Sequence, residues 1–360
     1  MSRIGIDATP LQKLNGGISY YLYYLLDELI KIRSNDTFYL FVERETKELQ
    51  LFKAYPNVRI YPIKYYSLGH SFWAQTLLSY ACIKTKIDVF WGPTQSIPLI
   101  KRPSMKTVLT QHDFVYRLHP ETVPWVSRLY FQLFSRFMIS QANVITAVSN
   151  GTGEKMEKFY GRKADCIITP PLKKSAYFRS DIQCHLQALS LKNKQYLVFV
   201  GTLEPRKNLE RLLAVYLQVL STSPDEVLPL VIIGSGGWKN KKLKALLEEK
   251  LFPDHIRALG YVTDEMQANI LSGARYCMLM SKYEGYGMPL AESRMCGTAV
   301  ICTDQLELRQ AAENDGVFLD ANWEETIRPY FLAKAAISLV KCPNYASNQE
   351  KAKQLESLCF

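Results

Sequence analysis

The chain has 360 residues, of which 48% are apolar, a proportion typical of a globular protein. A single hydrophobic core rarely serves more than about 200 residues, so we expect two domains. No run of about 18 uncharged apolar residues occurs, and a strand-like segment begins at Arg3. The sequence therefore predicts neither a membrane-spanning helix nor a secretory leader.

The cysteines and the charges narrow the class further. The eight cysteines are scattered, without a Cys-x-x-Cys pair or a histidine at zinc-ligand spacing. We therefore expect reduced thiols in a cytoplasmic protein and no bound metal. The net charge is +10, which is typical of proteins that bind nucleic acid, an anionic membrane or an anionic substrate.

In the first half, short apolar strands alternate with longer segments, as in parallel βα units. A helical pattern covers residues 18–32. The predicted strands of this half are 3–9, 38–42, 58–63, 88–92, 107–113 and 143–149.

The second half repeats this alternation. Its predicted strands are 196–201, 229–234, 256–262, 276–281 and 298–304. Between the halves lies a polar segment that begins near Pro170 and Pro171. We predict an α/β protein with two doubly wound, Rossmann-like domains, at residues 1–172 and 196–360, joined by a linker at 173–195.

Ligands of such sheets bind beyond the carboxyl ends of the strands. After strand 196–201 come Arg206 and Lys207, followed by a helix for which Asn208 is a suitable N-cap. The helix dipole disfavours cations at this end by about 0.3–1 kcal/mol, so we expect an anion such as a diphosphate to join them. A solvated basic turn is the alternative.

The segment SKYEGYGMPLAE (281–292) follows another predicted strand. Gly285 and Gly287 lead into a helix, where backbone amides can bind an anion. Because carboxylates repel phosphate, we expect Glu284 and Glu292 to accept hydrogen bonds from hydroxyls, one from a ribose and one from a sugar. Alternatively, the two are ordinary acids of a loop and of a first helical turn.

Three further candidates lie at predicted strand ends. Gly234 opens the loop GSGGW, Gly17 precedes the helix 18–32, and His112 ends the strand 107–113. GSGGW does not match Gly-x-Gly-x-x-Gly, so a nicotinamide cofactor is not expected. A tight turn, loop punctuation and a structural histidine are the respective alternatives.

Taken in order, these segments resemble the retaining GT-B glycosyltransferases of glycosyltransferase family 4, over nearly the whole chain. The two glutamates keep the E-x7-E spacing of that family. The segments are NGGISYY (15–21), QHDFVYRLHPE (111–121), ITAVSNGT (145–152), FVGTLEPRKNLERLL (199–213), IIGSGGW (232–238), LGYVTDEMQANILSGA (259–274) and SKYEGYGMPLAESRMCGTAVI (281–301).

The resemblance implies a role for each candidate in the second half. Arg206 and Lys207 are similar to the pair that holds the donor diphosphate. Glu292 is similar to the acid that binds the ribose, and Glu284 to the glutamate that contacts the donor sugar at the reacting centre. The glycines of these loops, Gly234, Gly285 and Gly287, would offer backbone amides to the donor.

In the first half, Gly17 resembles a glycine near the donor phosphates, and His112 a histidine that touches the donor sugar. The family implies a nucleotide-diphosphate sugar held mostly by the second domain and an acceptor held by the first. It also implies transfer with retention, front-face attack within an ion pair, and neither a cofactor nor a metal. A double displacement through a covalent intermediate stays open.

The sequence departs from the family pattern in two places. Leu308, Arg309 and Gln310 stand where many relatives read Leu-Pro-Glu, which removes an acidic contact. The chain ends at Phe360, about where relatives continue into a helix that crosses back to the first domain, so we expect a looser closure.

The form of the donor motifs is most similar to that of bacterial polysaccharide enzymes that use GDP-mannose. We therefore expect mannosyl transfer, and rhamnosyl and glucosyl donors stay open. Two alternative functions remain: a nucleotide-sugar-binding scaffold without catalysis, and a sugar-nucleotide epimerase of the same architecture.

The distribution of positive charge along the chain indicates what kind of acceptor to expect. Residues 1–180 hold 24 Lys and Arg against 13 Asp and Glu, whereas residues 181–360 hold 20 against 21. No nucleic-acid-binding motif accompanies this excess, so we do not expect nucleic acid as a partner. The aromatic segments 18–26, 70–80 and 123–138 are typical of interfacial helices, although core packing also explains them.

We therefore expect a peripheral protein whose first domain binds an anionic membrane at the cytoplasmic, inner face. Its acceptor would be an oligosaccharide or a lipid-linked glycan in the assembly of lipopolysaccharide or another surface polysaccharide.

Overall fold

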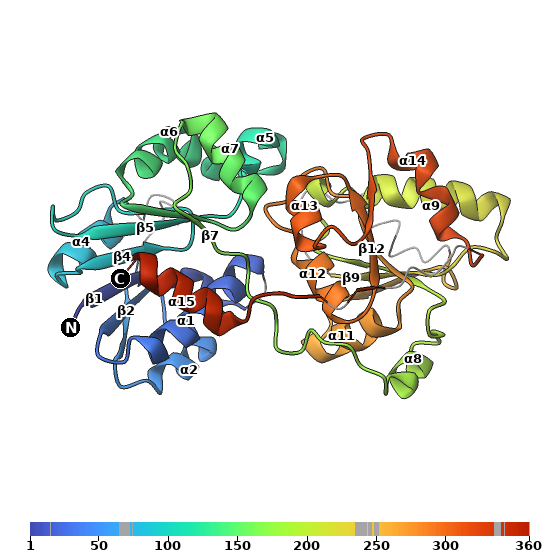
Figure 1. Ribbon diagram of the computed structural model, residues 1–360, viewed down its shortest axis with the longest axis horizontal. Coiled ribbons are helices and arrows are strands. Elements are labelled where there is room, and N and C mark those ends of the chain that lie inside the picture. Colours follow the sequence, from blue (N-terminus) through green and yellow to red (C-terminus); the bar gives the residue numbers. More distant parts are fainter. Residues whose placement is uncertain are drawn as a thin grey trace. The chain divides into compact units, whose positions relative to one another are not determined.

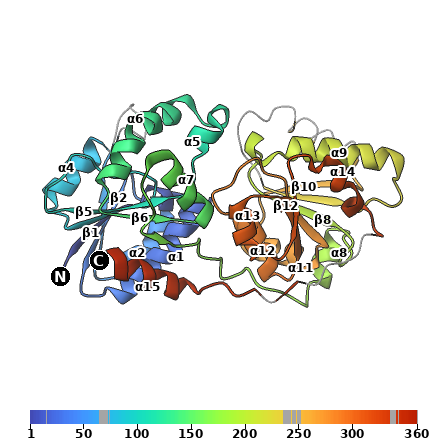
Figure 2. The ribbon, with the colours of Figure 1, turned by 45° about the horizontal axis from the view of Figure 1, so that its top comes forward.

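A computed structural model describes residues 1–14, 16–64, 73, 75–234, 243, 247, 252–334, 340–341 and 343–359 (Figures 1 and 2). The chain divides into two compact units. Unit 1 comprises Met1–Pro171 and Tyr345–Phe360, and unit 2 comprises Leu172–Asn344. Within the described residues, no helix is long and apolar enough to cross a membrane.

Unit 1 is built on a parallel sheet with the strand order β3-β2-β1-β4-β5-β6-β7. Its strands read as nearly unbroken apolar runs because helices cover both faces of the sheet. They are β1 (Arg3–Asp7), β2 (Thr37–Val42), β3 (Val58–Pro62), β4 (Val89–Gly92), β5 (Lys106–Gln111), β6 (Val144–Ala147) and β7 (Cys166–Ile167).

Figures 1 and 2 show α1, α2 and α15 on one face of this sheet and α4, α6 and α7 on the other. The second face covers a core that includes Phe90, Leu109, Tyr130 and Met138. The helices of unit 1 are α1 (Gly17–Ile32), α2 (Gln50–Lys53), α4 (Leu77–Lys84), α5 (Val115–Leu118), α6 (Trp125–Gln141), α7 (Asn150–Tyr160) and α15 (Asn348–Cys359).

Unit 2 has a second parallel sheet, with the order β10-β9-β8-β11-β12-β13. Its strands are β8 (Leu197–Val200), β9 (Leu230–Ile233), β10 (Ile256–Gly260), β11 (Tyr276–Leu279), β12 (Ala299–Thr303) and β13 (Val317–Leu319). Its helices are α8 (Gln183–Ala188), α9 (Leu209–Thr222), α11 (Asp264–Gly273), α12 (Met288–Met295), α13 (Leu306–Ala311) and α14 (Trp323–Thr326).

The predicted fold class, two doubly wound α/β domains, is confirmed. Every predicted strand is present, whereas β7 and β13 were not predicted. These two strands lie at one edge of each sheet and have two and three residues. Strands this short leave too little alternation or apolar length to stand out in the sequence.

The C-terminal segment differs from the prediction. Residues 345–360 were assigned to the second domain, and no returning helix was expected, yet α15 packs against α1 in unit 1. The Arg33 guanidinium lies 3.1 Å from the Glu356 carboxylate, and Lys351 Nζ donates to the Pro170 carbonyl over 2.8 Å. The apolar stripe of α15 is too narrow among its polar residues to be conspicuous in the sequence.

The predicted linker, 173–195, lies in unit 2 and contains α8.

Candidate functional site

The turn after β8 brings two cations next to a buried carboxylate of unit 2. Residues Pro205–Lys207 form one 3₁₀ turn, and α9 follows it. Lys207 Nζ lies 2.6 Å from Glu284 Oε1, and Arg206 Nη1 lies 2.8 Å from Glu284 Oε2. Lys207 is 7% exposed and Glu284 is 5% exposed. The turn is therefore not a solvated basic loop, which was the alternative explanation.

Asn208 occupies the position before α9 but does not cap it as its residue type predicts. It adopts a left-handed backbone conformation, with φ 58°, and its side chain makes no capping hydrogen bond. The left-handed residue ends the turn and redirects the chain into the helix, which is a conformation that asparagine tolerates well.

Glu284 is fixed by neighbours that the sequence did not single out. Ser281 Oγ donates to Glu284 Oε1 over 2.6 Å, and the Glu284 backbone N–H donates to Gln305 Oε1 over 3.2 Å. Gln305 Nε2 in turn donates to the Ser281 carbonyl over 2.7 Å and to Thr303 Oγ1 over 2.8 Å. Ser281, after β11, thus holds the carboxylate, and Gln305, after β12, holds the Glu284 backbone.

The electrostatics of the cluster keep Glu284 ionised. Burial opposes its ionisation, but the charges of Arg206 and Lys207 outweigh burial and lower the pKa of Glu284 to about 2. Burial also lowers the pKa of Lys207, with Glu284 opposing that shift. Such strongly perturbed, buried groups are typical of functional sites.

Glu292 lies on α12 in a separate hydrogen-bond network. It is 3% exposed, and Gln267 Nε2 donates to its Oε2 over 2.6 Å. Its other oxygen lies 4.0 Å from Lys173 Nζ, which donates to Asp264 Oδ1 over 2.8 Å. Burial raises the pKa of Glu292, and Lys173 counteracts the shift. The two glutamates therefore have no shared partner among the described residues.

Two of the predicted glycines occupy positions where the backbone conformation and the close neighbours leave no room for a side chain. Gly287 has φ 109°, and a Cβ there would lie 2.6 Å from Leu308 Cδ2. Gly234 has φ 136°, and a Cβ would lie 2.0 Å from the Gly201 carbonyl oxygen. The rest of the GSGGW loop, 235–238, lies outside the described residues, and Gly285 precedes Gly287 in the loop before α12.

His112 and Gly17 lie in unit 1. His112 follows β5, is 8% exposed, and packs edge-on against the Tyr21 ring at 4.9 Å. Its Nε2 donates to the Pro93 carbonyl over 2.7 Å, because a carbonyl oxygen only accepts. Burial lowers the pKa of His112, so the neutral ring keeps Nδ1 as an acceptor. Gly17 begins α1, and a Cβ there would meet nothing within 4 Å.

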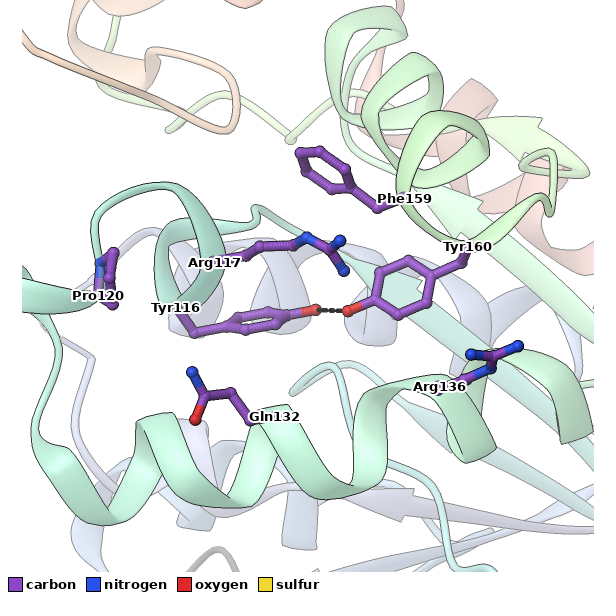
Figure 3. Close-up of a pocket in the computed structure, with 7 residues that line it drawn as sticks. All are labelled: Tyr116, Arg117, Pro120, Gln132, Arg136, Phe159 and Tyr160. Carbon is purple, nitrogen blue, oxygen red and sulfur yellow. Dashed lines mark hydrogen bonds between the residues drawn. The ribbon is translucent and has the colours of Figure 1, made fainter.

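Neither of two surface pockets is lined by a predicted site residue. A pocket of about 490 Å³ in unit 1 lies among α5, α6 and α7 (Figure 3). One of about 340 Å³ in unit 2 lies beside the Pro205–Lys207 turn, and its lining includes Glu204, Asn208 and Lys282. Among the described residues, no group of His, Cys, Asp and Glu side chains could hold a metal ion.

The sequence models of two protein families match consecutive parts of the chain. The model described as "Glycosyltransferase Family 4" matches residues 15–171, and "Glycosyl transferases group 1" matches residues 184–355. The chain belongs to glycosyltransferase family 4. The family predicted from the motifs is confirmed, and each match falls almost wholly within one structural unit.

Relatives of this glycosyltransferase family 4 chain include the O-antigen chain mannosyltransferase B of Escherichia coli. It is 30% identical over 248 residues, which are 68% of this chain and 64% of that protein. The N-acetylgalactosamine-N,N'-diacetylbacillosaminyl-diphospho-undecaprenol 4-alpha-N-acetylgalactosaminyltransferase of Campylobacter jejuni is 27% identical over 191 residues, 51% of this chain and 48% of that protein. The chain thus matches less than two thirds of each relative's length.

A solved structure supports the fold of the family 4 chain over nearly its whole length. WaaG, a glycosyltransferase involved in lipopolysaccharide biosynthesis, aligns with a TM-score of 0.70 and 14% identity. The alignment covers 99% of this chain and 95% of that one. The fold is GT-B, with two Rossmann-like domains, as the resemblance implied.

Sequence reasoning missed the residues that position this family 4 site. Ser281, Gln305, Gln267 and Lys173 hold the two glutamates, and the sequence did not single them out. However, Ser281 lies just beyond the carboxyl end of β11, and Gln305 lies just beyond that of β12. That place in the fold was the signal available for finding them.

Proposed function

We propose that the protein is a retaining glycosyltransferase that moves a hexose from a nucleotide-diphosphate sugar to a glycan acceptor in surface polysaccharide assembly. The observation that carries the proposal is the buried cluster of Arg206, Lys207 and Glu284 at the carboxyl end of a Rossmann-like sheet. A buried ion cluster is costly to form. Its presence here is best explained by a function that needs charges at fixed positions.

In this proposal Arg206 and Lys207 bind the donor diphosphate and stabilise the negative charge that develops on it as the bond to the sugar breaks. Preorganised cations in a water-poor site do this without reorganisation at the moment of reaction. Arg206 is also held by the Tyr283 carbonyl over 2.8 Å, so its position does not depend on the ligand alone. The proposal requires no metal or other cofactor.

Glu284 has an acceptor site left for the sugar. Its Oε1 accepts from both Lys207 and Ser281, whereas Oε2 accepts only from Arg206 among the described residues. A carboxylate oxygen accepts two hydrogen bonds, so Oε2 can accept one more, from a sugar hydroxyl. Glu292 would accept from the ribose, and His112 Nδ1 would accept from the donor sugar. We propose that the acceptor oxygen attacks C1 on the face from which the diphosphate leaves.

The donor and acceptor follow from the relatives. The name of the Escherichia coli relative specifies mannose, which supports GDP-mannose as the donor. The name of the Campylobacter jejuni relative specifies a diphospho-undecaprenol glycan, which supports a lipid-linked acceptor. We propose that the protein works at the inner face of the membrane as a peripheral enzyme.

A panel of nucleotides tests the proposal. The melting temperature of the full chain is measured with GDP, UDP, ADP and dTDP, since a ligand at 100 times its Kd stabilises by about 2.7 kcal/mol. GDP should give the largest shift, and a shift with UDP alone would contradict the mannose donor. Incubation with GDP-mannose should then release GDP slowly, and an epimerised sugar nucleotide as the product would identify an epimerase instead.

A further inference from the structure

The pocket in unit 1 is open, polar and of a size that suits a small ligand. Its volume of about 490 Å³ lies within the usual range of ligand sites, about 300–1,000 Å³. The side chains come from α5, from the 3₁₀ turn Pro120–Thr122, from α6 and from the end of α7 (Figure 3). They are Tyr116, Arg117, Pro120, Gln132, Arg136, Phe159 and Tyr160.

Two arginines give this pocket its charge. Within the part of the chain that the structure describes, neither the Arg117 nor the Arg136 guanidinium forms a salt bridge or a hydrogen bond. The pocket lining contains no Asp or Glu. Two uncompensated guanidinium groups at one pocket favour an anion, and arginine is the residue best suited to a forked contact with phosphate.

Aromatic rings hold one of these arginines in place. The guanidinium carbon of Arg117 lies 4.5 Å from the Phe159 ring centroid and 5.5 Å from that of Tyr160. Tyr160 is itself fixed, because its hydroxyl lies 3.1 Å from the Tyr116 hydroxyl (Figure 3). Stacking on an aromatic face leaves the N–H edge of a guanidinium free, so Arg117 is preorganised to donate to a ligand.

The helix that supplies Gln132 and Arg136 also carries an exposed apolar stripe. On α6, Trp125, Leu129, Leu133 and Phe137 follow one another at intervals of four residues, and their exposed fractions are 74%, 42%, 52% and 56%. Residues 122–153 contain no Asp or Glu. An exposed apolar stripe flanked by arginines and free of carboxylates is typical of a helix at an anionic membrane surface.

We propose that this pocket binds the phosphate or diphosphate group of a membrane lipid, while the α6 stripe lies in the lipid interface. The inference rests on the proposed function, in which the acceptor is lipid-linked, and it assigns the acceptor's phosphate to Arg117 and Arg136. A phosphomonoester or diphosphate carries more charge than the phosphodiester of an ordinary phospholipid, and two arginines match that charge.

Vesicle binding by the full chain tests the inference. Phosphatidylcholine vesicles carry either phosphatidic acid, a phosphomonoester, or phosphatidylglycerol, a phosphodiester, at equal surface charge. The wild-type protein should bind the first kind about tenfold more tightly, which corresponds to one charged hydrogen bond. Arg117→Gln and Arg136→Gln should each remove most of this preference, whereas Leu133→Gln should weaken binding to both kinds.

The matched control is Arg59→Gln, which removes the same charge on β3, at the opposite edge of the sheet from β7. It should keep the preference. The inference is overturned if the wild type shows no preference, or if Arg117→Gln keeps it while remaining folded by circular dichroism.

Competition with a soluble ligand shows whether the pocket binds the phosphate of a membrane lipid or a free phosphate. Inorganic pyrophosphate should displace the wild type from phosphatidic acid vesicles and leave phosphatidylglycerol binding unchanged. Arg117-dependent binding of pyrophosphate without any lipid preference would assign the pocket to a soluble ligand and overturn the inference. The nucleotide melting shifts of the wild type, measured without vesicles, test the proposed function independently of these outcomes.

Discussion

At the scale of single residues, the site is defined by how Lys207 is paired. Its amino group is buried beside the Glu284 carboxylate and next to Arg206, which also lies 3.4 Å from the Glu204 carboxylate. The sequence predicted Arg206, Lys207 and Glu284 because charged side chains at strand ends stand out. It did not predict that they pair with one another, since nothing in the spacing of residues 207 and 284 brings them together.

The first prediction concerns Lys207→Ala. Loss of a donor that stabilises developing charge should lower kcat/KM for sugar transfer by about 100-fold or more. The melting temperature should fall as well, because the buried Glu284 carboxylate loses one of its two cationic partners. The sequence alone gave no reason to expect that loss of stability. Kinetics and thermal melting measure the two effects.

Lys282→Ala is the matched control for this variant. Lys282 lies one residue after Ser281, is exposed, and lines the neighbouring pocket of unit 2. It should leave kcat/KM within about threefold of the wild type. A loss of tenfold or less for Lys207→Ala would place the diphosphate contact elsewhere.

The second prediction concerns Glu284 and pH. Its pKa is lowered from 4.5 to about 2 in the folded protein. A carboxylate with a depressed pKa contributes stability that is fully present above its unfolded pKa and is lost as the pH falls towards 2. Glu284→Gln should therefore lower the melting temperature by roughly 10 °C at pH 7. The difference from the wild type should shrink steadily below pH 4.5.

Melting curves from pH 7 to pH 2.5 measure this difference. A gap between the two proteins that stays constant over that range would show that Glu284 is not the ionised partner of the two cations. Glu307→Gln serves as a comparison, because Glu307 is also a buried glutamate of unit 2 but follows β12, whereas Glu284 follows β11.

At the scale of elements, the two helix starts differ in whether the backbone requires a glycine. Gly287 precedes α12 in a conformation that other residues rarely adopt, and a Cβ there would lie only 2.6 Å from Leu308 Cδ2. Gly17 begins α1 in open space. The sequence identified both positions from their place before a helix, but only the backbone angles and neighbours distinguish them.

The third prediction compares these two glycines. Gly287→Ala should destabilise the protein by about 1–3 kcal/mol because of backbone strain and the contact with Leu308. Gly17→Ala should leave the melting temperature unchanged or slightly higher, because alanine favours a helix. If a donor phosphate approaches the start of α1, Gly17→Ala should nevertheless weaken donor binding, measured as a reduced melting shift with GDP-mannose.

Unchanged donor binding by Gly17→Ala would remove Gly17 from the site. Gly16→Ala is the natural comparison, since its Cβ would also meet nothing within 4 Å. A large loss of stability in either variant would contradict the open surroundings of the start of α1.

At the scale of the whole molecule, the fold was predictable because short apolar strands alternate with longer segments throughout the chain. What escaped prediction is the path of the chain's end: α15 returns to unit 1 and packs on α1. A helix whose buried residues are chiefly Ala352, Leu355 and Cys359 gives a weak periodic signal, and its partner lies more than 300 residues away. Long-range packing of this kind is not encoded in any local pattern.

The two structural units differ in net charge, as the two halves of the sequence do. Unit 1 holds 23 Lys and Arg against 15 Asp and Glu, and unit 2 holds 21 against 19. The excess positive charge is therefore a property of the unit that carries the exposed stripe of α6. Both features lie on one unit, which is what a membrane-facing domain requires.

The fourth prediction is that the full chain binds anionic vesicles peripherally and that salt weakens this binding. Each Lys or Arg near an anionic leaflet contributes about 1 kcal/mol, and this attraction decays within a Debye length. That length falls from about 10 Å at 0.1 M salt to about 3 Å at 1 M, so sedimentation with anionic vesicles should decline over this range. Part of the binding should persist at high salt, because burial of Trp125 and its apolar neighbours on α6 does not depend on charge. Equal sedimentation with neutral and anionic vesicles at low salt would contradict the prediction and favour a soluble acceptor.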